Sequence, residues 1–172
     1  PNIFDRLLEA FPEIDQIIIE TNGNLLYHNE TAIKFLKIAA KYSGKLKLTL
    51  SISPKLRGKV SYSDKVDDHE LINIYKEVFK NYQEYLSCLV EIQVKFVHSE
   101  VLRIQNEKLM NIIINEKLVW PRTKILVMPF TPSLKIQNFD QVWKESKDAA
   151  AKYALENYLR YSQRIHIDRG ME

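Results

Sequence analysis

Helical and extended patterns alternate strictly along this chain, and that alternation limits the folds open to it. Apolar residues recur at helical spacing near 2–11, 29–42, 67–86, 99–111 and 139–159. Extended apolar stretches lie at 14–19, 45–53, 88–97, 123–129 and 164–167. Strands that alternate with helices form parallel sheets with right-handed crossovers. The pattern therefore predicts an α/β fold, a parallel sheet with alternating helices, and it leaves open whether that sheet is flat or part of a barrel.

Length and composition restrict the class of protein further. The 172 residues suffice for one domain with a sizeable core, so we expect a single α/β domain over 1–172. No stretch reaches 18 consecutive apolar residues, so no membrane partner is expected. The net charge of +3 is spread along the chain, which does not favour nucleic acid as a partner. The single cysteine, Cys88, excludes an internal disulfide and fits a cytoplasmic location.

The second extended stretch ends in Ser53-Pro54-Lys55. Pro54 cannot continue a central ladder, because its φ is fixed and it has no N–H to donate. Ser53 and Lys55 are two residues apart, so in an extended chain they point to one side. The carboxyl edge of a parallel sheet is where α/β proteins bind ligands. A hydroxyl and an ammonium there suit a carboxylate or a ribose; the alternative is an ordinary polar exit from a strand.

The first extended stretch ends in Glu20-Thr21-Asn22-Gly23. Gly23 allows a tight turn, and the Thr21 hydroxyl and Asn22 amide could bind a ligand beside it. Asn-Gly is also a common turn in any protein. Glu20 is either a carboxylate that faces the ligand or the polar end of a strand.

Other polar residues have weaker signals. Lys95 shares a side of its strand with Gln93, so it either reaches the surface or faces a site. Arg164 and His166 alternate near the C-terminus and either touch a substrate or are structural. The histidines show no metal-ligand spacing, so no metal site is predicted in the chain. Asn138 and Gln141 predict a capping box at the start of the last helix.

Four segments in this order resemble the radical S-adenosylmethionine family, in particular the 7-carboxy-7-deazaguanine synthases. They are residues 20–23, 53–55, 91–97 and 160–166. In that family these segments lie on successive strands of a partial (β/α) barrel and near its C-terminus. The resemblance covers nearly the whole chain, and it implies that the sheet here is part of such a barrel.

The resemblance also implies a reaction. Reductive cleavage of S-adenosylmethionine yields a 5′-deoxyadenosyl radical, which abstracts hydrogen from 6-carboxytetrahydropterin. The pterin then contracts to 7-carboxy-7-deazaguanine with loss of ammonia, a step of queuosine and archaeosine biosynthesis. The implied cofactors are S-adenosylmethionine, a [4Fe–4S] cluster and Mg²⁺, and the implied assembly is a homodimer. Cofactor-binding residues would be Ser53, Lys55 and Glu20. Residues that bind the pterin-like substrate would be Thr21, Asn22, Arg164 and His166.

The chain departs from that family in its thiols. The family binds its cluster with three cysteines spaced Cys-x3-Cys-x2-Cys, and this chain has only Cys88. The chain also starts at Pro1 rather than at a methionine, so one hypothesis is that a segment upstream of Pro1 carries the cluster ligands. A second hypothesis is a non-catalytic half-barrel that binds a ligand or another subunit. A third is an unrelated α/β domain.

Overall fold

A computed structural model of the chain describes its main helices and strands. The described residues are 3–22, 29–42, 44–54, 72–73, 76, 91–115 and 123–163. The strands are β1 (Gln16–Thr21), β2 (Lys47–Ile52), β3 (Glu91–His98), β4 (Thr123–Pro129) and β5 (Arg160–Tyr161). The helices with assigned bounds are α1 (Ile3–Ala10), α2 (Asn29–Tyr42), α5 (Arg103–Asn115) and α6 (Phe139–Glu156).

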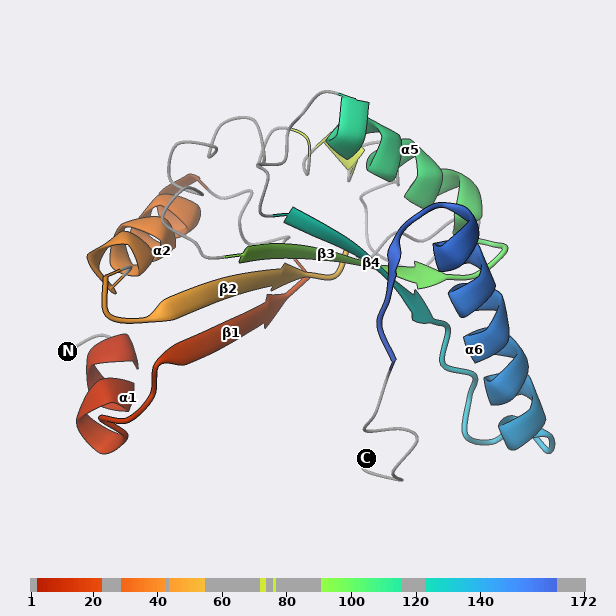
Figure 1. The fold of residues 1–172 in the computed structure, drawn as a ribbon, viewed down its shortest axis with the longest axis horizontal. Helices are drawn as coiled ribbons and strands as arrows, with labels where there is room; N and C mark the ends of the chain where they lie inside the picture. The colour runs from red at the N-terminus through yellow and green to blue at the C-terminus, as the bar shows by residue number, and fades with distance from the viewer. Residues whose placement is uncertain are drawn as a thin grey trace.

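The five strands form one sheet in the order β1-β2-β3-β4-β5, and every neighbouring pair is parallel (Figure 1). The predicted α/β class is therefore confirmed. The strand order follows the chain without a reversal. A doubly wound sheet reverses its strand order at a switch point, whereas a (β/α) barrel does not. The described strands of this sheet show no such reversal.

Most element bounds agree with the sequence pattern. The helix expected over 29–42 and the strand expected over 123–129 have those bounds in α2 and β4. The helix expected from 99 begins later, at Arg103, because a turn comes first: the Leu102 N–H donates to the Ser99 backbone oxygen at 3.1 Å and to its Oγ at 3.3 Å. Most of the helix expected over 67–86 and the whole strand expected over 164–167 lie outside the described residues.

The predicted capping box is wrong. Asn138 precedes α6 with φ −111° and ψ 40°, and its side chain makes no capping hydrogen bond. A capping residue needs an extended backbone to aim its side chain at the first helical N–H groups. Gln141 instead donates from Nε2 to Glu145 Oε1 at 3.0 Å, one turn further along the helix.

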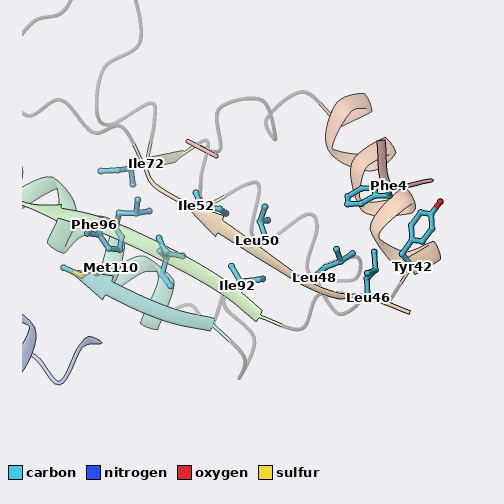
Figure 2. Packing of buried hydrophobic residues seen from close by; sticks show 13 residues of the cluster. Phe4, Tyr42, Leu46, Leu48, Leu50, Ile52, Ile72, Ile92, Phe96 and Met110 are labelled. Carbon is cyan, nitrogen blue, oxygen red and sulfur yellow. The ribbon is translucent and has the colours of Figure 1, made fainter. Parts of the chain in front are cut away.

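One face of the sheet is apolar and carries the core. Alternate residues of β2 and β3 lie on it, and the register sets Leu50 beside Ile92 and Ile52 beside Val94. These side chains pack against Leu109, Met110 and Ile113 of α5. Figure 2 shows Phe4 and Tyr42 at one end of this cluster and Ile72 and Phe96 at the other. Each such buried side chain stabilises the fold by about 1.5–3 kcal/mol.

The last two strands have a smaller core of their own. Val127 of β4 packs against Ala150 and Ala154 of α6, and Tyr161 of β5 lies against the same cluster. The small alanines let α6 approach the sheet closely. The helix therefore fixes the position of β5, which pairs with β4 through Arg160 and Tyr161 and through the Ser162 N–H, a donor to the Val127 oxygen at 2.9 Å.

Candidate functional site

The other face of the sheet carries polar and charged side chains from all five strands, and we call it the polar face. Strand alternation and the pairing register assign its residues, because neighbours in register lie on the same face. Its polar members are Gln16, Glu20, Lys47, Thr49, Ser51, Glu91, Gln93, Lys95, Lys124 and Arg160. Apolar members are Ile18, Val97, Leu126 and Met128.

Four of the polar residues form a row across the sheet. Glu20 of β1 is in register with Ser51 of β2, which is in register with Gln93 of β3. Gln93 is in register with Lys124 of β4. Neighbouring strands lie about 4.8 Å apart, so each side chain of the row can contact the next.

An ion pair crosses this row from β3 to β1. Lys95 Nζ lies 2.5 Å from Glu20 Oε1. Because β2 lies between the two strands, the lysine side chain has to pass over β2. Continued by one residue, the register sets Lys95 level with Ser53, whereas Glu20 is level with Ser51, so the lysine crosses β2 diagonally between these two small side chains. The Lys95 side chain is only 16% exposed, whereas that of Glu20 is 71% exposed.

Ser51 lies buried beneath this pair. It is 1% exposed, and among the described residues its Oγ has no hydrogen-bond partner. A buried hydroxyl without a partner costs about 1–3 kcal/mol, so such groups need an explanation. Ser51 is therefore the one member of the row whose side chain has unused hydrogen-bonding capacity in a buried position.

A second ion pair lies at the amino ends of β3 and β4. Lys124 Nζ pairs with Glu91 Oε2, and Gln93 Nε2 donates to Glu91 Oε1 at 2.5 Å. The Glu91 side chain is 16% exposed and that of Lys124 is 35% exposed. Both carboxylate oxygens of Glu91 therefore have partners, so this group is a closed structural unit.

The structure brings two of the expected site residues to neighbouring strand ends. Glu20 lies near the end of β1, and Ser53 follows β2 in a half-buried position. The Ser53 N–H donates to the Thr21 oxygen at 2.8 Å, so β1 and β2 remain paired there. Thr21 itself is in register with Ile52, which places it on the apolar face, opposite to Glu20. Asn22 is exposed just beyond β1.

Three expected site residues cannot be placed. Lys55, Arg164 and His166 lie outside the described residues, as does Cys88. Sequence reasoning did not select Lys95, although alternation had grouped it with Gln93. The signal that identifies Lys95 is its ion pair with Glu20, which reaches diagonally across β2 because the register sets Gln93, two residues before Lys95, across from Glu20.

A further polar group lies on the apolar face, between β3, α5 and α6. The rings of His98 and Tyr153 have centroids 4.8 Å apart, and Tyr153 Oη donates to Glu107 Oε1 at 3.5 Å. Burial lowers the pKa of His98. Burial, and then the neighbouring Glu107, raise the pKa of Tyr153. The adjoining cavity measures about 10 Å³, about enough for one water, so this group is a packing site.

No family model, curated protein or solved structure matches this chain. Within the described part of the chain, no three His, Cys, Asp or Glu side chains are placed to hold a metal ion. A [4Fe–4S] cluster does not fit these residues either, because three thiolates are needed and Cys88 is the only cysteine of the 172 residues. None of the helices in the described ranges has the length and apolar character needed to cross a membrane.

Proposed function

We propose that this chain is the ligand-binding part of a radical S-adenosylmethionine enzyme of the 7-carboxy-7-deazaguanine synthase type. The observation that carries the proposal is the placement of the landmark segments on the sheet. Residues 20 and 21 end β1, residue 53 follows β2, residues 91–97 lie in β3, and residues 160 and 161 form β5. The described residues of each segment lie in a strand or directly after one, in one parallel sheet whose order follows the chain, an order that a partial barrel also has.

The polar face supports the binding part of this function. Ser53 offers a half-buried hydroxyl at the carboxyl end of β2, and Glu20 offers an exposed carboxylate on the neighbouring strand. A hydroxyl suits the ribose or carboxylate of S-adenosylmethionine, and a carboxylate suits its ammonium group. Lys55 would complete the cofactor site. Asn22, which is exposed just beyond β1, would bind the pterin-like substrate.

The radical chemistry itself needs a group that these residues do not hold. This chain's own residues would bind and orient the cofactor and the substrate, and thiolates from outside the 172 residues would hold the cluster. We therefore propose catalysis only together with a segment that contains Cys-x3-Cys-x2-Cys. A homodimer in the cytoplasm is part of the same proposal.

Titration calorimetry with S-adenosylmethionine tests the binding part. We expect saturable binding to the 172-residue chain and an affinity about tenfold lower for Ser53→Ala, since one hydrogen bond to a polar ligand is lost. Ser133→Ala is the matched control, because Ser133 is exposed in the segment between β4 and α6. Absence of S-adenosylmethionine binding, or equal losses in the two variants, would overturn the proposed cofactor site.

The second candidate function is a non-catalytic half-barrel that binds a ligand or another subunit. The single cysteine favours it. The intact mass of the native protein, compared with the coding sequence upstream of Pro1, separates the two. A larger protein with a Cys-x3-Cys-x2-Cys segment supports the enzyme, and a native chain that starts at Pro1 supports the binding module.

A further inference from the structure

We propose that Lys95 and Ser51 form a subsite for a carboxylate on the polar face, and that Glu20 pairs with Lys95 only while the subsite is empty. The inference rests on the proposed function, because S-adenosylmethionine and 6-carboxytetrahydropterin each carry one carboxylate. It adds a named recognition group to that function, at two residues that the sequence pattern did not select.

The first argument is the position of the Lys95 ammonium. Its side chain leaves β3, crosses β2 and ends 2.5 Å from a carboxylate oxygen on β1. The ammonium therefore lies over the β1 side of the polar face, on a side chain that is only 16% exposed. A lysine held in this way presents one positive charge to any anion that enters the polar face from above.

The second argument is the buried Ser51 hydroxyl. Ser51 is in register with Glu20, the residue whose carboxylate the Lys95 ammonium reaches across β2. Its Oγ is buried and without a partner among the described residues. A carboxylate seated over β2 in place of the lysine stem could accept hydrogen bonds from both Ser51 Oγ and Lys95 Nζ. Without a ligand, the Ser51 hydroxyl thus has no hydrogen-bond partner within the described part of the chain, and an incoming carboxylate could accept its hydrogen bond.

The third argument is how weakly Glu20 is fixed. Its side chain is 71% exposed, and exposed ion pairs contribute little net stability. Glu20 can therefore exchange its partner for water easily. Glu91 offers the contrast, since it is 16% exposed and bonded to both Lys124 and Gln93. Of these two acids, Glu20 is the one that a ligand carboxylate can replace.

Sodium propionate is the simplest probe of the subsite. We expect a titration of the full chain, followed by NMR, to move the signals of Ser51 and Lys95 together and to saturate. Lys95→Met should weaken the apparent affinity at least about tenfold, and Ser51→Ala about threefold to tenfold. Lys47→Met is the matched control, because Lys47 lies on the same face and pairs with Asp15 at 3.7 Å. Equal effects of Lys95→Met and Lys47→Met would overturn the subsite.

The two natural carboxylates are distinguished by Glu20→Gln. S-adenosylmethionine also carries an ammonium, which Glu20 could accept once Lys95 has left it, so we expect the variant to bind S-adenosylmethionine more weakly. Pterin-6-carboxylate has no such ammonium, and Glu20 only competes with it for Lys95, so the variant should bind it about threefold more tightly. Either change supports the subsite and identifies its ligand. Unchanged affinity for both compounds would overturn it.

These outcomes also separate the subsite from the proposed function. If S-adenosylmethionine and pterin-6-carboxylate each bind the wild-type chain and Lys95→Met equally well, the subsite is overturned and the function stands. If propionate binds at Ser51 and Lys95 while neither S-adenosylmethionine nor pterin-6-carboxylate binds, the subsite stands and the function is overturned. Circular dichroism of each variant verifies that it is folded.

Discussion

On the polar face, the Lys95–Glu20 pair and the Lys124–Glu91 pair have the same chemistry but different surroundings. Glu91 is largely buried, lies directly beside its partner strand and accepts a second hydrogen bond from Gln93. Glu20 is exposed, and its lysine reaches it across a whole strand. The comparison teaches that an ion pair is structural where its carboxylate is enclosed, and available to a ligand where the carboxylate is solvated.

The largest expected effect distinguishes the two acids by stability. Glu91→Ala leaves the Lys124 ammonium and the Gln93 amide without their acceptor in a partly buried position. We expect the free energy of unfolding to fall by about 2 kcal/mol. Glu20→Ala should change it by about 0.5 kcal/mol or less. Urea unfolding of both variants measures the difference, and equal losses would contradict the comparison.

Ser51→Ala should have the next largest effect, and in the opposite direction. The substitution removes a buried hydroxyl that has no partner, so we expect the free energy of unfolding to rise by about 1 kcal/mol. Ser53→Ala is the control, because Ser53 is half-buried and should be near neutral. Thermal unfolding of both variants gives the result. A loss of stability in Ser51→Ala would mean that its hydroxyl is already satisfied in the folded protein.

Lys95→Met removes the cation of the exposed Lys95–Glu20 ion pair. Methionine keeps much of the covered stem, and the exposed Glu20 carboxylate is left in water. We expect the free energy of unfolding to change by about 0.5 kcal/mol, whereas propionate binding is lost. Urea unfolding should therefore show a small change in stability for this variant, whereas the propionate titration should show a large loss of affinity. A large loss of stability would place Lys95 with Lys124 as a structural residue.

The smallest expected effect concerns His98, which packs against Tyr153 on the apolar face. Burial lowers the pKa of His98, so between its folded pKa and the ordinary value of 6.5 the unfolded chain binds the extra proton. Stability should therefore increase as the pH rises through this window and decrease as it falls. His98→Gln should flatten the profile below pH 6.5. The measurement is the urea midpoint against pH, and an unchanged slope in the variant would assign the pH dependence to other groups.

The fold could be predicted because its signals are local. The apolar spacing that defines 29–42 as a helix and 123–129 as a strand depends on residues close together in the chain, and both elements have the expected bounds. The capping box failed because it depends on the backbone dihedral angles of Asn138, which the residue types alone do not determine. The helix expected from residue 99 starts at Arg103 for a similar reason, because a turn between Ser99 and Leu102 precedes it.

The candidate site was only partly predictable because it depends on register. Glu20 and Ser53 were selected as strand ends, a local property. Lys95 became a candidate only when the folded sheet brought its ammonium to Glu20, 75 residues earlier in the chain. Ser51 follows the polar alternation along β2, and its burial appears only in the folded structure. Contacts between residues so far apart in the chain produce no periodic pattern in the sequence.

The strand order described above also has a consequence for folding. Every pair of neighbours in the sheet is also consecutive among the described strands, so each new unit can add to an edge that already exists. Domains fold progressively as the ribosome releases them, and sheets whose central strand arrives last must wait. Here β1 and β2 can pair before β3 is synthesised, and α5 then covers the apolar side chains of β2. We therefore expect the sheet to assemble during translation from β1 onward, with the two residues of β5 joining last.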